Sequence, residues 1–421
     1  MVHNFLRKLK RTTSGPDDIP YWFWKTYAEI LTPVITRIFN TSLKSGKIPN
    51  VWKRADVIPS PKENSINSCS QLRPISLTDV IMRLFEKCVY QSEVADTVYN
   101  YIGDDQFAYK KGHNSTMALI KYQHMWLKSL DEGAKSVRVI TFDFSKAFDS
   151  VPHDILFNKI KKIPINPYII NWMIDFLNNR RQRVKVDGVT TEFLDINRGV
   201  PQGTVLGPIM FTIMVNDIKE VSLSNDLSKF ADDIAIIAPV YDHEDSAGGE
   251  VENMKLWSNE NRMSLNMEKT YEMIVRGKVS TPLPYHIPSI KRKEWLKLLG
   301  VTMEDIPGKW DKHFEEMMKK ASSRMYILRV CKHYGLSTHQ LDLLFNSLIV
   351  SLFTFAVEVW GGASYNKYVS QIDKFVNRAY RNGYISNRSD FKATISNRDK
   401  KLWSRIINDD KNALCNLLPN V

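Results

Sequence analysis

The sequence has few cysteines, no long apolar run and no excess of acidic residues, and each absence removes a class of protein. Neither a CxxC pair nor a metal-ligand spacing with histidine is formed by the four cysteines, Cys69, Cys88, Cys331 and Cys415. This pattern argues against a zinc site or a disulfide framework and fits a reducing compartment. The N-terminus also lacks the apolar segment of a secretory signal.

The most apolar stretch covers residues 341–360. It is interrupted by Asp342, Asn346 and Glu358, and such side chains are costly inside a lipid bilayer. We therefore predict a buried helix there rather than a membrane span. The sequence favours an intracellular protein that is neither secreted nor embedded in a membrane.

Basic residues outnumber acidic ones, 58 to 46, which gives a net charge of +12. The excess lies at the two ends: residues 1–135 carry 19 basic and 13 acidic side chains, and residues 301–421 carry 18 and 12. The middle, 136–300, has 21 of each. Positively charged end regions on either side of a neutral middle region suit a protein that binds a polyanion. Ordinary surface charge for solubility explains the same distribution.

Helical patterns predominate at both ends of the chain. Apolar residues at helical spacing follow Pro33 and stop before Gly46, which predicts a helix between them. A second helix is predicted after Thr78 or Asp79, either of which could cap it, and the polar segment 59–71 is predicted to be an exposed loop. The tail carries an apolar stripe formed by Phe314, Met317, Met318, Ala321, Met325 and Leu328.

The middle of the chain has strand patterns instead. Residues 137–144 (VRVITFDF) and 230–237 (FADDIAII) are rich in β-branched and aromatic side chains, and both are predicted strands. The dipeptide Asp187-Gly188 between valine-rich runs predicts a hairpin. Residues 251–270 return to a helical pattern. The sequence therefore predicts a helical front, a mixed middle and a helical back.

Three acidic residues stand out in this middle region. Asp232 and Asp233 are adjacent within an apolar run, and Asp143 lies inside the strand pattern at 137–144. A solvated turn explains the pair alone, but three carboxylates converging from two strands repel one another unless a divalent cation lies between them. Mg²⁺ suits such a set, since it binds carboxylate oxygens and completes its shell with water and substrate phosphates. Two such ions can activate a 3′-hydroxyl and stabilise leaving pyrophosphate.

The order of several segments resembles the reverse transcriptases of non-LTR (LINE-like) retrotransposons. Their palm blocks are similar to FDFSKAFDSV, RGVPQGTVLGP, KFADDIAII, SLNMEKTYEMIV and KLLGV. Their finger blocks are similar to GPDDIP, IPSPK, LRPISL and DDQFAYKKGHNSTMALI, and their downstream helical region is similar to WDKHFEEMMKKASSRMYILRV and LIVSLFTFAVEVWG. The resemblance therefore covers nearly the whole chain.

This resemblance implies an α+β, right-hand polymerase fold. Residues 1–135 would form the N-terminal part of helical fingers, and 136–300 a palm with an antiparallel sheet and packed helices. Residues 301–421 would form a helical thumb or connection. Neither an endonuclease domain nor an RNase H domain is predicted, so we expect the endonuclease activity, and hence a nick or primer, to come from elsewhere.

The resemblance also implies catalytic roles. Asp143 and Asp232 would be the principal metal ligands, with Asp233 as the third carboxylate. The backbone carbonyl of Phe144 would also reach a metal ion. Lys269 matches the position of a general acid for the leaving pyrophosphate.

Further positions match nucleotide and primer contacts of the family. Lys62 and Arg73 would hold the triphosphate, and Gln202 and Gly203 would lie beside the incoming nucleotide. Phe148 would be a steric gate against a 2′-hydroxyl. A simple core aromatic at Phe148 and a solvated surface cation at Lys62 are the alternatives. The primer grip would be formed by Leu299 and Gly300.

The function implied by the resemblance is RNA-directed DNA polymerase activity. The enzyme would extend the 3′-hydroxyl of a DNA primer on an RNA template with dNTPs, using two Mg²⁺ ions, with Mn²⁺ as a substitute. The enzyme would act within a ribonucleoprotein in the nucleus or cytoplasm. Two alternatives stay open: a reverse transcriptase of the intron maturase type, and a nucleic-acid-binding relic of the same fold that has lost catalysis.

Overall fold

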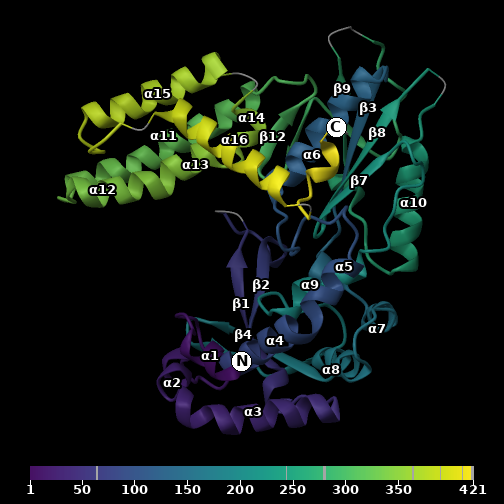
Figure 1. Cartoon of the computed structure of the whole chain (residues 1–421), viewed down its shortest axis with the longest axis vertical. Coiled ribbons are helices and arrows are strands. Elements are labelled where there is room, and N and C mark those ends of the chain that lie inside the picture. Colours follow the sequence, from purple (N-terminus) through teal and green to yellow (C-terminus); the bar gives the residue numbers. More distant parts are fainter. Residues whose placement is uncertain are drawn as a thin grey trace. The chain divides into compact units, whose positions relative to one another are not determined.

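The computed structural model describes residues 1–62, 65–242, 244–277, 281–362, 365–388, 390–409 and 411–418. The chain contains both helices and strands, with largely antiparallel sheets and separate runs of helices, in agreement with the predicted α+β class (Figure 1). The chain forms two compact units whose segments are interleaved. Unit 1 comprises Met1–Lys111, Phe144–Lys219 and Asn253–Leu265, and unit 2 comprises Gly112–Asp143, Glu220–Glu252 and Asn266–Val421. The boundaries 1–135, 136–300 and 301–421 stay a prediction.

Unit 1 is built largely from helices. These are α1 (Val2–Arg7), α2 (Tyr21–Thr26), α3 (Ala28–Ser45), α4 (Val80–Val89), α5 (Ala95–Tyr101), α7 (His153–Ile160), α8 (Pro167–Leu177) and α9 (Leu206–Met214). Aromatic rings join three of them: Phe85 of α4 stacks on Phe39 of α3 with ring centroids 3.9 Å apart, and its edge meets Trp172 of α8 at 4.8 Å. The packing fixes α4 in the middle of this unit.

The helix predicted between Pro33 and Gly46 is longer than expected. Helix α3 begins at Ala28, so the predicted start at Pro33 is wrong, and this proline lies inside the helix. Proline removes a single backbone donor there, and residues 28–32 extend the helix by more than one turn before it. The predicted end is confirmed: Gly46 adopts the left-handed conformation with φ of 62°.

Unit 1 also contains a sheet, of which the sequence analysis predicted only the hairpin at Asp187-Gly188. Its strands are β1 (Arg54–Pro61), β2 (Leu72–Leu77), β4 (Arg180–Val186), β5 (Val189–Thr190) and β6 (Leu194–Ile196). Strand β1 pairs antiparallel with β2 and parallel with β4. The predicted hairpin at Asp187-Gly188 joins β4 to β5, with positive φ at both turn residues. The sequence analysis missed β1 and β2 because Pro59 pairs with Pro74, and prolines obscure a strand pattern.

Unit 2 contains the predicted antiparallel palm sheet. Its strands run in the order β10 (Lys291–Lys293), β9 (Tyr271–Arg276), β3 (Ser136–Phe142), β8 (Asp233–Val240) and β7 (Asp226–Phe230). Strands β9, β3, β8 and β7 are labelled in Figure 1. All neighbours are antiparallel except β9 and β10. Helix α6 (Ser115–Asp131) packs on this sheet, and α10 (Ala247–Glu260) follows β8. Helix α10 ends at Glu260, ten residues before the end of the predicted helical pattern.

The tail of the chain shares one hydrophobic core with this sheet. It consists of β11 (Trp295–Leu298), β12 (Val301–Glu304), α11 (Asp311–His333), α12 (Thr338–Phe345), α13 (Ser351–Thr354), α14 (Val357–Trp360), α15 (Tyr365–Arg381) and α16 (Phe391–Asn408). Alternate residues of the sheet, such as Val137 and Val139, face the same core as Phe314, Met317 and Leu328 of α11. The tail helices therefore brace the sheet.

The apolar stretch 341–360 is not one helix. A π-helical turn at Asn346–Val350 separates α12 from α13, and Ala356, with φ of 47°, separates α13 from α14. Within the described ranges, no helix is both long and apolar enough to cross a membrane.

Candidate active site

Strand register brings the three predicted carboxylates to one edge of the palm sheet. The last pair between β3 and β8 is Phe142 with Ile234, so the next step along both strands sets Asp143 opposite Asp233. Residues directly opposite in an antiparallel pair have Cα atoms about 4.5–5.5 Å apart. Asp232 lies in the turn between β7 and β8, because Phe230 pairs with Asp233 across it. All three acids belong to unit 2.

The local sequence explains why these acids end the strands. Residues 234–240 of β8 are buried, whereas Asp233 is exposed and Asp143 and Asp232 are half-buried. Ala231 takes a positive φ of 57° in the tight turn, which is uncommon for a residue with a side chain. The carboxylates thus lie where an apolar sheet meets solvent, and not within its core.

Behind these acids lies a buried tyrosine of α6. Tyr122 is 2% exposed, and burial, together with the nearby negative charges of Asp233 and Asp226, raises the pKa of its phenol. The phenol therefore stays neutral.

The chemistry of this edge suits a hard divalent cation. In the described part of the chain, no group of three or more His, Cys, Asp or Glu side chains is placed to hold a metal ion. Mg²⁺ does not require such a group, because it is usually held by one or two carboxylates and completed by water and substrate phosphates. Asp143, Asp232 and Asp233 offer only oxygen ligands, so these residues fit Mg²⁺.

Lys269 lies on the other side of β3. The backbone N–H of Asn266 donates to the carbonyl of Asp143 at 2.7 Å, which ties the short turn Met267–Lys269 to the end of β3. Strand β9 then begins at Tyr271, paired with Thr141. The side chain of Lys269 is exposed. Strand β3 thus has the carboxylate turn on one flank and the Lys269 turn on the other.

The predicted primer grip is the turn of a hairpin in unit 2. Leu298 pairs with Val301, and the two residues between them, Leu299 and Gly300, have φ of 46° and 90°. These positive angles define a two-residue turn of the kind that favours glycine. A Cβ atom added at Gly300 would lie 3.1 Å from the ring of Phe355, so the turn packs closely on the tail.

Unit 1 holds the predicted nucleotide-binding residues. Arg73 of β2 pairs with Ser60, and the backbone N–H of Lys62 donates to the carbonyl of Gln71 at 2.9 Å. Side chains alternate between the faces of a strand, so Lys62 and Arg73 lie on the same face of the β1–β2 hairpin, one diagonal step apart. Both side chains are exposed. The ammonium of Lys62 donates to the carbonyl of Ser70 at 3.2 Å.

The glycine-rich loop after β6 lies against β2. The backbone N–H of Ser76 donates to the carbonyl of Gln202 at 2.7 Å. Gly203 has φ of 107°, and a Cβ atom there would lie 2.9 Å from the carbonyl of Ser76 and 3.5 Å from the side chain of Ile75. The glycine is thus explained by close contact with a protein strand. Ile75 shares its face of β2 with Arg73, so the loop lies on the side of the predicted triphosphate cations.

Asp149 joins this group, although the sequence analysis assigned it no role. The amide of Gln202 donates to its carboxylate at 2.9 Å. Burial raises the pKa of Asp149, whereas Gln202 and the positive charges of Lys146 and Lys62 oppose the shift. Lys62 is therefore close enough to influence Asp149. The signal in the sequence was only a second aspartate six residues after Asp143.

The ring of Phe148 is fixed by stacking. Its centroid lies 4.3 Å from that of Phe211, with an angle of 13° between the planes. Phe211 is fully buried, whereas Phe148 is only half-buried. One side of the ring therefore packs in the core of unit 1, and its role as a gate stays a prediction.

Phe144 is buried in unit 1. It forms an isolated bridge with Leu265, and its ring meets Trp257 edge-on at 5.7 Å.

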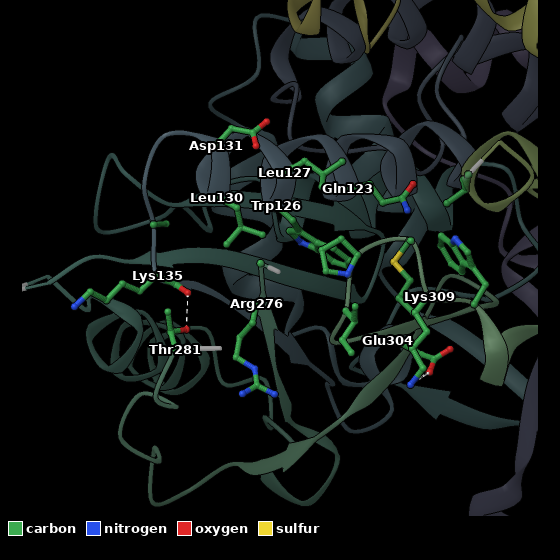
Figure 2. A pocket seen from close by; sticks show the side chains of 18 residues that line it. Gln123, Trp126, Leu127, Leu130, Asp131, Lys135, Arg276, Thr281, Glu304 and Lys309 are labelled. Carbon is green, nitrogen blue, oxygen red and sulfur yellow. Dashed lines mark hydrogen bonds and ion pairs between the residues drawn. The ribbon is translucent and has the colours of Figure 1, made fainter. Parts of the chain in front are cut away.

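A cavity of about 800 Å³ lies at the opposite end of β3 and β9 (Figure 2). Its lining includes Trp126, Lys135 and Arg276, and Arg276 pairs with Ser136 at the first step of the register. The carboxylates lie at the last step. None of the predicted site residues lines this cavity, so it is separate from the candidate active site.

Sequence comparison assigns the class of protein. Residues 60–303, more than half of the chain, match the family described as reverse transcriptase (RNA-dependent DNA polymerase), and the chain belongs to this family. The matched range contains the carboxylate edge, Lys62, Arg73 and the glycine-rich loop.

The curated relatives narrow the class and confirm the resemblance to non-LTR retrotransposon enzymes. The chain is 24% identical over 366 residues to the probable RNA-directed DNA polymerase from transposon BS of Drosophila melanogaster, covering 82% of this chain and 40% of that protein. It is 25% identical over 366 residues to that of the X-element of the same species, covering 82% and 39%. It is also 25% identical over 282 residues to that of mobile element jockey, covering 63% and 30%. The chain thus spans less than half the length of these relatives.

A solved structure of apo telomerase from Candida tropicalis, truncated from the C-terminal domain, has a TM-score of 0.40 at 13% identity, covering 70% of this chain and 61% of that one. This similarity is too low to add to the assignment.

Proposed function

We propose that this chain is the RNA-directed DNA polymerase part of a non-LTR retrotransposon protein. It would extend the 3′-hydroxyl of a DNA primer on an RNA template, consuming dNTPs and releasing pyrophosphate. The observation that carries this proposal is the register of β3 and β8, which sets Asp143 opposite Asp233 and beside Asp232 in a member of the reverse transcriptase family.

The carboxylates would hold the catalytic metal. When bound by Asp143 and Asp232, with Asp233 beside them and the carbonyl of Phe144 as a further oxygen ligand, two Mg²⁺ ions would activate the attacking hydroxyl and offset charge on the leaving group. Asp143 and Asp232 are half-buried, so their carboxylates would stay accessible to substrate.

Lys269 would supply a proton to the leaving pyrophosphate. Its turn is fixed to the backbone of Asp143, and its side chain is exposed. The donor atom of this general acid would be Nζ.

The residues of unit 1 would bind and select the nucleotide. The guanidinium of Arg73 offers a planar pair of donors to phosphate oxygens, and Lys62 offers a compact charge. Gln202, held by Asp149, would contact the base or sugar of the incoming nucleotide. Phe148, with one face stacked on Phe211, would present the rest of its ring to the position of a 2′-hydroxyl.

Primer extension tests the proposal. Purified protein with Mg²⁺, a primed RNA template and dNTPs should lengthen the primer, and Mn²⁺ should substitute. Asp232→Asn should abolish extension while leaving binding of the primer–template intact in a gel-shift assay. No extension with either metal would contradict the enzyme function and favour a binding protein of the same fold.

The partners follow from this reaction. They are the RNA template, the DNA primer and dNTPs, and we propose that the protein works in a ribonucleoprotein of the nucleus or cytoplasm. The net charge of +12 supports binding to nucleic acid. Leu299 and Gly300, at the hairpin turn, would contact the primer.

A further inference from the structure

One buried carboxylate in unit 1 has no place in the proposed chemistry. Glu86 lies in α4 among apolar residues and is 0% exposed. A buried acid is costly unless its oxygens accept hydrogen bonds, so its retention requires partners. Its partners are on the loop that carries Gln202.

The carboxylate of Glu86 caps helix α9 from another element. Its Oε2 accepts from the backbone N–H of Val205 at 2.9 Å and of Leu206 at 3.0 Å. The first N–H groups of a helix have no partner within the helix, and the N-cap residue usually supplies an oxygen. Here the N-cap is Val205, which has no side-chain oxygen. Glu86 supplies it instead, and its charge suits the positive end of the helix.

This contact fixes the far end of the glycine-rich loop. The near end is held to β2 by the bond from Ser76 to the carbonyl of Gln202, and Thr204 bonds within the loop to Pro201 at 2.9 Å. Gln202 precedes the capped residues by only three positions. Loss of the cap therefore frees the segment that carries Gln202 while β2 still holds its start.

We propose that Glu86 is a positioning residue for nucleotide binding, which acts by capping α9 and so fixes the side chain of Gln202. The inference rests on the proposed polymerase function and deepens it. Glu86 touches no substrate itself.

The charge state of Glu86 gives this role a pH signature. Burial raises its pKa to about 7, against the opposing effects of the Leu206 N–H, Arg180, the Val205 N–H and Arg83. The cations facing it are Arg83 on α4 and Arg180 on β4, and α9 presents backbone N–H groups. Above pH 7 the ionised form caps α9 more strongly than the protonated form does. Glutamine keeps an accepting oxygen but has no charge.

Steady-state primer extension with Glu86→Gln tests the role. We expect the KM for dNTP to rise about tenfold at pH 8, as loss of a charge-assisted contact predicts, with kcat changed less. The ratio of the two KM values should shrink at pH 6, where the wild-type side chain is itself largely protonated. Glu93→Gln is the matched control, because Glu93 is exposed seven residues further along the same helical segment.

A double-mutant cycle separates positioning from simple loss of stability. If Glu86 acts through Gln202, then Glu86→Gln should add little to the KM effect of Gln202→Ala, whereas it should multiply the effect of Arg73→Lys. The inference would be overturned if Glu86→Gln raised the KM by the same factor in the Gln202→Ala and Arg73→Lys proteins. It would also be overturned if the KM were unchanged in folded Glu86→Gln and Glu86→Ala proteins.

Hydrogen exchange provides a readout that needs no activity. The amides of residues 202–206 should exchange faster in Glu86→Gln than in Glu93→Gln, with the amides of α4 unchanged. Unchanged exchange at 202–206 would overturn the capping role even where wild-type protein extends primers. If exchange is faster in Glu86→Gln but the wild-type protein extends no primer, the capping role of Glu86 is supported and only the proposed polymerase function is rejected.

Discussion

Two buried acids of unit 1 and three acids at the sheet edge of unit 2 differ in exposure, and the difference suits a structural role for the first set and the proposed catalytic role for the second. In unit 1, Glu86 and Asp175 are buried and accept hydrogen bonds from backbone or lysine donors of the same unit. In unit 2, Asp143 and Asp232 are half-buried and Asp233 is exposed at the end of a sheet. An acid that holds the fold can be enclosed, whereas an acid that serves a metal and its substrate must stay accessible.

The substitution Asp143→Asn tests this comparison most directly. Loss of a metal-binding oxygen should lower the rate of primer extension at least about a thousandfold. The free energy of unfolding should change by no more than about 0.5 kcal/mol, because the side chain lies outside the core. Extension rate and urea denaturation measure the two effects. A large loss of stability would place Asp143 with the structural acids.

The counterpart in unit 1 is Asp175→Asn. The carboxylate of Asp175 accepts from the N–H of Ile48 at 2.8 Å and lies 2.7 Å from the ammonium of Lys53, which is 3% exposed. Removing its charge leaves Lys53 buried without its counter-ion, so the free energy of unfolding should fall by about 3 kcal/mol. Denaturation of the purified variant checks this value. A stable but inactive variant would reverse the comparison.

A smaller effect is expected at Arg73, an exposed cation of unit 1. Arg73→Lys keeps the charge but loses the planar pair of donors, so the KM for dNTP should rise about tenfold. Thermal stability should stay the same because the side chain is exposed. Kinetics at varied dNTP concentration measure the change. An unchanged KM would show that Arg73 is a solvated surface cation.

Phe148 tests whether a half-buried ring also serves the site. Phe148→Ala should allow ribonucleotides to be incorporated, raising their kcat/KM relative to dNTPs by about tenfold or more. The lost stack on Phe211 should also lower stability, by about 1–3 kcal/mol. Unchanged sugar selectivity in a destabilised protein would return Phe148 to a purely structural role.

A further expected effect is a pH dependence of stability due to Glu86. Its folded pKa of about 7 lies above the ordinary value of 4.5, so the native state binds more protons between these pH values and stability falls as pH rises through them. The free energy of unfolding of Glu86→Gln should therefore increase relative to that of wild type as the pH rises from 5 to 8. Urea denaturation at both pH values measures the gain. A constant difference would mean that Glu86 is ionised throughout.

Local patterns sufficed for much of the fold and the site. The strand before Asp143, the turn at Asp187-Gly188, the end of α3 at Gly46 and the helical stripe of α11 were all predicted from spacing and turn chemistry. Strands β1 and β2 were not, since their prolines hide the period and their pairing partner β4 lies over a hundred residues away. The break at Ala356 likewise has no local signal.

By itself, the sequence determined the identities of the acids and cations and their order along the chain. Two finger cations, Asp143, a glycine-rich loop and the pair Asp232 and Asp233 follow one another in that order, within the ordered set of segments that indicated the family. Only the tertiary structure decided which of them are neighbours: register sets Asp143 against Asp233, and pairing sets Lys62 on the face of Arg73. Glu86 was recognised only in the structure, because an acid that caps a helix 120 residues away leaves no pattern in its own segment.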